Sequence, residues 1–564
     1  MAMVSLGGLL RGRSLAAAAC LTALLAAPTA AQDAPTRLAD RFLELVREQG
    51  LAPDQVALLV FSERHQAVLM QHRAGEPMPA ASNTKLVTAY AALRALSPNF
   101  RWRTRVFRIA KHDGAADTGR QGPPDGLLIE GAGDPTIVYA DLELLAQRVR
   151  AAGIRAVTGG LYLDESKFGA IPPGAARPAA ELEPSDLPEE PDGGTGADDA
   201  AGMLPPQAFI VERNAPEFLI ALAGPGGAPD VLSPLPAEAL RTVNRLQAST
   251  TRRSVIRVEQ QANDARTTFT FSGSVLPGNH TLAVQVDDPT ALFGHALRAA
   301  LHRQGVEGPL PLRTQVPAGL RRDLLFSWYS PALKDAIAPI LRDSDNLAAD
   351  NLIWTLAVQG RQAGRAGPPD LKDGLHWVLR ILQQDFPGIQ GEMELADGSG
   401  LNADSRISAR ALVRVLKGAL DRPEFAPEFE SALSRAGWDG TLHYRSYPAS
   451  IQGRLRAKTG TLAGIQNLTG TFPLAQDQIV FAFLIAAPGQ SRTRLQSAQD
   501  RILEGLFALL RNAEIVAPVG DPLAPRVLTP PPASVKPGRK RHLLPPPPSP
   551  KPQPDEAGGQ ASAR

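Results

Sequence analysis

The stretch AASNTKLV, residues 80–87, places Ser82 and Lys85 three positions apart at the start of a long helical pattern. Positions i and i+3 of a helix share a face, with side chains roughly 5–6 Å apart, so the lysine amine can reach the serine hydroxyl. A serine hydroxyl is a weak nucleophile until a neighbouring base takes its proton, and lysine can be that base where burial or another cation lowers its pKa. This is the only S-x-x-K in the chain, yet alone it fits an exposed pair better than an active site.

A second short motif, the S-x-N of Ser344 and Asn346, lies in RDSDNLAADNL at the head of a helical pattern. A loop at this point would present both side chains to a cleft. Serine and aspartate are also favoured helix N-caps, and the two roles are compatible. Another S-x-N occurs at Ser97 and Asn99, but it follows Lys85 too closely to return beside it as a separate wall.

The third motif is the K-T-G of AKTGTL, at Lys458, Thr459 and Gly460, followed by Thr461. The lysine supplies a cation, the threonine a hydroxyl, and the glycine lets a strand edge approach a ligand closely. K-T-G alone is common and is typical of a tight turn. The joint occurrence of S-x-x-K, S-x-N and K-T-G in this order is specific, because it defines the active-site-serine enzymes that recognise penicillin.

On these motifs the chain resembles the class C low-molecular-mass penicillin-binding proteins, the D-alanyl-D-alanine carboxypeptidase/endopeptidase family that trims peptidoglycan. Four further stretches carry the resemblance: GAGDPTI at 131–137, ADGSGLN at 396–402, GWDGTLHYR at 437–445 and LRAKTGTLAGIQNLTG at 455–470. The long segment between the first two motifs is similar to the large insertion of this family and exceeds that of compact β-lactamases. The resemblance covers roughly residues 35–512.

The resemblance implies a role for each motif residue. Ser82 would attack the carbonyl between two D-alanines to give an acyl-enzyme, and Lys85 would accept its proton. Ser344, beside Lys458, would relay a proton to the leaving amine, while Asn346 would bind the acyl side of the substrate. Backbone N–H groups of Ser82 and of the third motif would form the oxyanion hole, and β-lactams would leave the serine trapped. The residues expected to bind the substrate are Thr459, Gly460 and Thr461.

The patterns outside the motifs predict an α+β fold, with an antiparallel sheet flanked by helices, and the resemblance implies the penicillin-binding-protein/β-lactamase-like serine transpeptidase fold. Helix- and strand-like segments at both ends of the chain are expected to build one catalytic domain from residues 32–104 and 325–515. Residues 105–324, where strand-like runs predominate, are expected to form an inserted accessory region. Its acidic, Gly- and Pro-rich segment 174–202 predicts a long surface loop.

The two ends of the chain have their own textures. Residues 1–31 combine a basic start, an apolar run and small residues, which predicts a cleaved signal peptide and a periplasmic location. An uncleaved membrane anchor and a lipoprotein cleaved before Cys20 are the alternatives. Residues 516–564 are dominated by proline and predict a disordered tail, whose basic residues suggest weak contact with anionic wall polymer or a membrane surface.

Composition and missing motifs exclude several other functions. The 59 basic and 57 acidic residues nearly cancel, so nothing indicates a nucleic-acid partner. The chain lacks H-E-x-x-H, zinc-type cysteine and histidine spacing, the P-loop and G-x-S-x-G, so no metal or other cofactor is expected. GAGDP lacks the third glycine of a dinucleotide site and predicts a tight turn, and Asp397 and Ser399 in ADGSGLN predict a turn that supports the site.

Two competing functions remain open at this stage. A secreted β-lactamase or esterase with the same nucleophile would deacylate β-lactams rapidly, although the long insertion argues against it. A non-catalytic wall-binding protein would be expected to have lost a motif residue, and none is lost. The pattern does not distinguish carboxypeptidase from endopeptidase action, and it leaves the oligomeric state and the role of the insertion open.

Overall fold

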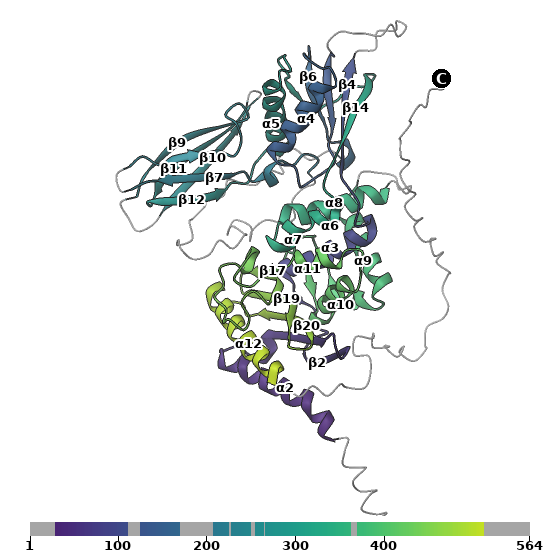
Figure 1. Ribbon diagram of the computed structural model, residues 1–564, viewed down its shortest axis with the longest axis vertical. Coiled ribbons are helices and arrows are strands. Elements are labelled where there is room, and N and C mark those ends of the chain that lie inside the picture. The colour runs from purple at the N-terminus through teal and green to yellow at the C-terminus, as the bar shows by residue number, and fades with distance from the viewer. Residues whose placement is uncertain are drawn as a thin grey trace, which may run out of the picture.

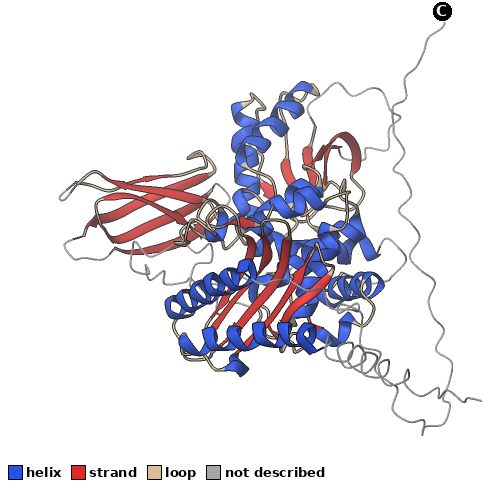
Figure 2. Cartoon of the chain, turned by 60° about the horizontal axis from the view of Figure 1, so that its bottom comes forward, coloured by secondary structure: helices blue, strands red, loops and turns tan. Residues whose placement is uncertain are grey.

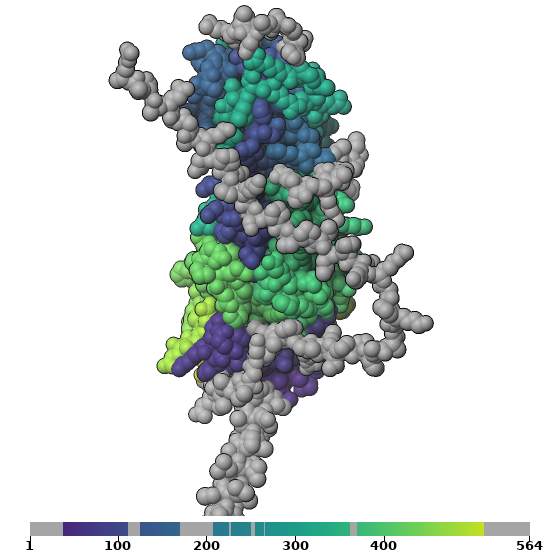
Figure 3. All heavy atoms as spheres, turned by 90° about the vertical axis from the view of Figure 1, so that its right-hand side faces the viewer, coloured from purple at the N-terminus to yellow at the C-terminus, as the bar shows by residue number. Residues whose placement is uncertain are grey.

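A computed structural model describes residues 29–512, apart from 111–123, 170–206, 225–226, 250–253, 264–265 and 362–368. The described chain has two parts stacked along its long axis, as Figures 1 and 3 show. One part contains both ends of the described chain, and the other is formed by the intervening segment. Most of the predicted signal segment, the acidic loop 174–202 and the tail 516–564 lie outside the described residues.

A six-stranded antiparallel sheet is the centre of the first part. Its strand order is β17-β18-β19-β20-β1-β2. The strands are β17 (Ser434–Arg435), β18 (Arg456–Leu462), β19 (Ile465–Pro473), β20 (Gln478–Ala486), β1 (Val56–Ser62) and β2 (Ala67–His72). Strand β1 pairs with β20 from Val56 opposite Ile485 to Ser62 opposite Ile479. The two ends of the sequence therefore complete one sheet, which makes the long intervening segment an insertion in space as well as in sequence.

Helices cover both faces of this sheet, as Figure 2 shows. Alternate residues of β1 enter different cores, because side chains of a strand alternate between faces: Val56 and Leu58 on one face, Ala57 and Leu59 on the other. The first face is covered by α2 (Thr29–Glu48) and α12 (Arg492–Asn512), which lie side by side at the purple and yellow end of Figure 1. The second face is covered by α3 (Thr84–Leu96), α8 (Asn346–Arg361), α9 (Leu371–Asp385) and α10 (Ala409–Leu420).

Helix α3 is the central helix of this layer. Every residue from Thr84 to Leu93 is buried, so the helix is surrounded by protein and only weakly amphipathic. Short elements complete the layer: α6 (Leu333–Ala336), α7 (Ala338–Arg342), α11 (Ala426–Ser431) and a small sheet of β15 (Met393–Glu394), β16 (Arg406–Ile407) and β3 (Met78–Pro79). The fold is α+β, as the sequence predicted, and the N-terminal turns of α3 lie inside the protein, between the sheet and the other helices of this layer.

The inserted part contains a five-stranded sheet, at the top of Figure 1, and a strand-rich arm, at the upper left of Figure 1. The sheet runs β13 (Leu312–Arg313), β6 (Gly160–Asp164), β5 (Gly126–Glu130), β4 (Arg103–Ala110), β14 (Arg321–Tyr329), and packs against α4 (Tyr139–Ala151) and α5 (Pro289–Arg303). The arm has two three-stranded sheets: β10 (Val255–Ala262), β11 (Thr267–Val275) and β9 (Leu240–Ala248); and β12 (Gly278–Ala283), β7 (Glu217–Leu222) and β8 (Asp230–Leu232).

The arm has an aromatic core. The ring of Phe218 lies 5.2 Å from that of Phe269 and 4.8 Å from that of Phe271. Paired strands β4 and β14 connect the insertion to the first part, and they run across the positions 104/105 and 324/325 where the sequence pattern divided the chain. The division into domains therefore stays a prediction. Within the described ranges, no helix has the length and apolar character needed to cross a membrane.

Candidate active site

The S-x-x-K motif lies where a short 3-10 turn, Ala81–Asn83, enters α3. Lys85 is fully buried, and its Nζ lies 2.8 Å from Ser82 Oγ. The same amine donates to Asn346 Oδ1 at 2.6 Å and to the carbonyl oxygen of Ser399 at 2.8 Å. Ala81, the residue before the serine, has a φ of 47°, in the left-handed region that costs a residue with a side chain about 1–3 kcal/mol. The serine is thus presented by a strained turn and faces a lysine inside the protein.

The S-x-N motif precedes α8 directly, and its residues point in different directions. Asp345 is the N-cap of α8, because its Oδ1 accepts a hydrogen bond of 3.0 Å from the backbone N–H of Ala348. The N-cap role considered for Ser344 therefore belongs to its neighbour. Ser344 has a φ of 62° and accepts a hydrogen bond of 2.9 Å from Lys458 Nζ. Asn346 reaches Lys85, so the two motif side chains contact the lysines of the other two motifs.

The K-T-G motif lies on β18, against the turn that carries Ser82. Besides Ser344, Lys458 Nζ donates to the carbonyl oxygen of Thr459 at 2.9 Å. A Cβ on Gly460 would lie 2.9 Å from the carbonyl oxygen of Ala80, closer than real Cβ contacts allow. Glycine is needed here because the strand and the turn are in backbone contact. This contact brings Thr461, the next residue, close to the Ser82 turn.

Two lysines share the site, and this affects their protonation. Burial lowers the pKa of Lys458 well below its usual value, and the positive charge of Lys85 lowers it further. Asp343 acts in the opposite direction but is the smallest of the three causes. Two ammonium charges close together in a buried site are costly, so the positive charge of Lys85 disfavours the protonated form of Lys458.

Residues outside the three motifs also shape the site. Asp397, in ADGSGLN, accepts hydrogen bonds from the backbone N–H groups of Gly400 and Asn402 at 2.8 Å each. The turn that results presents the Ser399 carbonyl to Lys85, in keeping with the supporting role expected of this stretch. Thr441, in GWDGTLHYR, was not recognised from the sequence, and its Oγ1 accepts a hydrogen bond of 2.8 Å from Thr459 Oγ1. Only the family resemblance of that stretch pointed to it.

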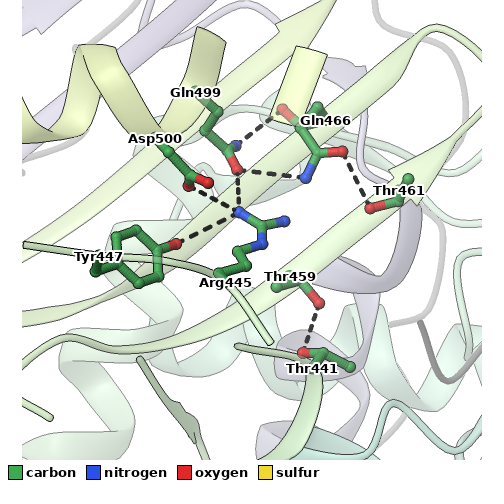
Figure 4. Close-up of polar contacts among 8 residues, drawn as sticks. All are labelled: Thr441, Arg445, Tyr447, Thr459, Thr461, Gln466, Gln499 and Asp500. Carbon is green, nitrogen blue, oxygen red and sulfur yellow. Dashed lines mark hydrogen bonds and ion pairs between the residues drawn. The ribbon is translucent and has the colours of Figure 1, made fainter. Parts of the chain in front are cut away.

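A buried polar network continues from Thr461 into the protein, as Figure 4 shows. Thr461 Oγ1 donates to Gln466 Oε1 at 3.3 Å, and Gln466 Nε2 donates to Gln499 Oε1 at 3.3 Å. Arg445 Nη1 donates to the same Gln499 oxygen at 2.9 Å and pairs with Asp500 at 3.2 Å. Sequence patterns did not predict this network, because its members come from a loop, two strands and a helix and share no motif.

The GAGDPTI stretch joins the insertion to α8. It forms a loop after β5 in which Gly133 has a φ of 70°. The carbonyl oxygen of Gly133 accepts a hydrogen bond of 2.6 Å from Asn351 of α8. The next residue, Asp134, accepts from the backbone N–H and hydroxyl of Thr136 at 2.9 and 2.6 Å, and burial raises its pKa to about 6. Across the described ranges, no three His, Cys, Asp or Glu side chains gather in a way that could hold a metal ion.

Known proteins resemble this chain over most of its length. Residues 40–505 match the D-Ala-D-Ala carboxypeptidase 3 (S13) family. A D-alanyl-D-alanine carboxypeptidase of an Actinomadura species is 28% identical over 87% of this chain and 90% of the relative. The D-alanyl-D-alanine carboxypeptidase DacB of Haemophilus influenzae is 26% identical over 75% of this chain and 83% of its own.

A solved structure shows the same fold. The crystal structure of penicillin binding protein 4 (dacB) from Haemophilus influenzae aligns with a TM-score of 0.63 and 22% sequence identity, covering 84% of this chain and 99% of the other. The expected penicillin-binding-protein fold is thereby confirmed. With side chains of three penicillin-enzyme motifs in hydrogen-bond contact and a family match that extends from α2 to α12, this chain belongs to the D-Ala-D-Ala carboxypeptidase 3 (S13) family of serine peptidases.

Proposed function

We propose that this peptidase hydrolyses the D-Ala–D-Ala bond of peptidoglycan stem peptides through an acyl-enzyme on Ser82, and that it also cleaves the cross-links between stem peptides. The observation that carries the proposal is the 2.8 Å separation between Lys85 Nζ and Ser82 Oγ. A base in contact with the hydroxyl is what a serine nucleophile requires. The family membership supports the identification of D-Ala–D-Ala as the bond that is cleaved.

Acylation begins when Ser82 Oγ attacks the carbonyl carbon between the two D-alanines. Lys85, in its neutral form, takes the hydroxyl proton as the new C–O bond forms. The negative charge that develops on the carbonyl oxygen is stabilised by the backbone N–H groups of Ser82 and Thr461. Each such donor contributes about 3 kcal/mol to the transition state. The contact between Gly460 and the Ser82 turn supports this pairing of donors.

Release of the terminal D-alanine needs a proton on its nitrogen, because an amide anion is a very poor leaving group. Ser344 hands its proton to that nitrogen as the C–N bond breaks, and Lys458 replaces the proton on Ser344. The 2.9 Å hydrogen bond from Lys458 Nζ to Ser344 Oγ supports this relay. Asn346 orients the acyl part of the substrate, and its Oδ1 holds the Lys85 amine toward the serine. Water then attacks the ester carbonyl and the bond to Ser82 Oγ breaks, releasing the shortened peptide as an acid. Lys85 returns its proton to Ser82, and the proton that water loses replaces the one that Lys458 gave up.

Binding of the substrate carboxylate falls to the third motif. The amine of Lys458 and the hydroxyl groups of Thr459 and Thr461 are hydrogen-bond donors that suit a carboxylate, and Gly460 leaves room for the substrate backbone. A β-lactam presents a strained amide and a carboxylate to the same groups. Its leaving nitrogen stays tethered in the adduct, so we infer slow deacylation and covalent inhibition.

The substrate also suggests where the enzyme works. Peptidoglycan lies outside the cytoplasmic membrane, so we propose a periplasmic enzyme exported by residues 1–31. The catalytic domain would then comprise residues 32–104 and 325–515, with 105–324 as the accessory region. The basic residues of the tail 516–564 would make weak contact with anionic wall polymer or a membrane surface.

Incubation of the purified protein with a fluorescent penicillin and with a pentapeptide muropeptide tests the proposal. Wild type should form a covalent adduct and release D-alanine, and Ser82→Ala should do neither. Ser97→Ala, at the other S-x-N and away from the cleft, is the matched control and should behave as wild type. A wild type that forms no adduct and releases no D-alanine would refute the proposal, and rapid turnover of the penicillin would identify a β-lactamase instead.

A further inference from the structure

Asp345, between the two residues of the S-x-N motif, connects the active site to the insertion. Its Oδ1 caps α8, while its Oδ2 accepts a hydrogen bond of 2.7 Å from Arg213 Nε. The Asp345 side chain is 6% exposed and that of Arg213 is 48% exposed. Arg213 belongs to the insertion, far from the motif in sequence. Ser344 and Asn346 are the two chain neighbours of Asp345. The ion pair of Asp345 with Arg213 therefore ties the second motif to the insertion.

Arg213 is presented by an unusual turn. Glu212, Arg213 and Asn214 have φ values of 48°, 56° and 51°, so three successive residues with side chains adopt left-handed geometry. Such residues are unfavourable one at a time and persist only where the surroundings determine them. The turn is fixed by hydrogen bonds to Glu212 from Tyr139 N at 2.8 Å and to the Asn214 carbonyl from Val286 N at 2.9 Å. The guanidinium therefore projects from a rigid base.

Helix α8 has a second attachment to the insertion one and a half turns further on. Asn351 Nδ2 donates to the Gly133 carbonyl at 2.6 Å, and Asn351 Oδ1 accepts from Gln207 N at 3.2 Å. Side chains of α8 also enter the cores of both parts. Leu352 lies in the core of the first part, and Trp354 packs against the core of the insertion. Figure 1 shows α8 at the junction of the two parts.

We propose that the insertion is a clamp for the second motif, and that Arg213, by holding Asp345, is a positioning residue that directs Ser344 to Lys458 and Asn346 to Lys85. The inference rests on the proposed function of Ser344 as the group that protonates the leaving amine. Ser344 has left-handed geometry of its own and would relax if its neighbour were released. Loss of the clamp should therefore weaken proton delivery more than the attack by Ser82.

Two substrates with the same acyl group separate these steps. A D-Ala–D-Ala peptide loses an amine that must be protonated, whereas a thiolester analogue loses a thiolate that leaves without a proton. We would measure kcat/KM, which reports acylation, for Arg213→Gln, Arg213→Lys and Asp345→Asn, since asparagine keeps the N-cap but loses the charge. Arg303→Gln is the matched control, because Arg303 pairs with Glu143 at 2.9 Å within the insertion.

The clamp predicts a selective loss. Arg213→Gln and Asp345→Asn should each lower kcat/KM for the peptide about fivefold, because each removes one partly exposed ion pair. Each should lower kcat/KM for the thiolester less than about twofold. The double variant should be no worse than either single variant, because both remove the same interaction. Arg213→Lys should recover most of the activity, and Arg303→Gln should match wild type.

Other results would overturn the inference in distinguishable ways. Equal losses on both substrates would indicate a merely structural pair, and additive losses in the double variant would show that the two residues do not act together. Variants that match an active wild type would refute the clamp alone. A wild type that neither reacts with penicillin nor releases D-alanine would refute the proposed function and the clamp with it.

Discussion

Gly400→Ala is a small change that should disable the nucleophile from outside its motif. Gly400 follows the Ser399 carbonyl that binds Lys85, and it has a φ of 79°. A Cβ at this position would overlap the carbonyl oxygen of Ala81 and lie 2.7 Å from Thr84 Oγ1. Both neighbours are within two residues of Ser82, and one of them is backbone that cannot rotate away.

Two terms set the expected magnitude. Left-handed geometry costs alanine about 1 kcal/mol relative to glycine. The overlap adds about 1–3 kcal/mol, as is typical when an atom is forced into a packed interior. The Ala81 turn is already strained, so we expect it to move, and a shift of about 1 Å in a catalytic group can cost about a hundredfold in rate. The rate of acylation by penicillin should therefore fall about ten- to a hundredfold.

Gly489→Ala is the matched control, because Gly489 has a φ of 83° and a Cβ there would meet nothing within 4 Å. It carries the same conformational term, so it should lower stability by about 1 kcal/mol and leave acylation unchanged. Stopped-flow acylation by a fluorescent penicillin and thermal unfolding would be measured for both variants. A folded Gly400→Ala protein that acylates as fast as wild type would show that the Ser399–Gly400 turn does not position Ser82.

Three further predictions concern buried charge. The first variant is Lys458→Met. Because the pKa of Lys458 is lowered in the native state, the unfolded chain binds more protons than the native one at pH values between that pKa and 10.5. The stability of wild type relative to the variant should therefore rise with pH in thermal melts from about pH 7 to 10. For Asp134→Asn the pH dependence has the opposite sign. The pKa of Asp134 is about 6 in the native state and 3.8 ordinarily, so the native state binds more protons than the unfolded chain between these values. Wild type should therefore lose stability relative to the variant as the pH of the melts rises from 3.8 to about 6. Arg445→Met should lower the free energy of unfolding by about 3 kcal/mol, because Asp500 loses its partner in a buried site, and chemical denaturation that finds no loss would contradict this.

The fold was largely predictable because its patterns are local. The continuous apolar run of β1 and the helical spacing of apolar residues in α12 are set by residues close in sequence, so each element could be recognised alone. What the sequence did not reveal was the pairing of β1 with β20, which joins segments at opposite ends of the chain. The patterns at both ends predicted the parts of an antiparallel sheet, but no local pattern specifies which of its strands are neighbours.

The site was predictable to the extent that it is written in motifs. The structure places Ser82 and Asn346 in hydrogen-bond contact with Lys85, and Ser344 in contact with Lys458. The two groups are joined through the segment from Ser344 to Asn346, and Lys458 lies on the same strand as Thr459, Gly460 and Thr461. Thr441, Arg445 and Gln499 could not be found in this way, because a single threonine, arginine or glutamine has no diagnostic spacing. Their contribution depends on tertiary contacts that bring a loop against β18 and the last helix against β19.

The backbone strain in the site has a consequence for the role of the insertion. Ala81, directly before the first motif, and Ser344, in the second motif, have φ values of 47° and 62°, so each of the two catalytic segments includes a residue in an unfavourable conformation. Such geometry persists only where surrounding contacts offset its free energy. For the Ser82 turn those contacts come from the same part of the molecule, which contains both ends of the described chain, through β18 and the Gly400 turn. For Ser344 they include the Arg213–Asp345 pair, so the second motif depends on the insertion for a geometry that the first motif obtains from its own domain.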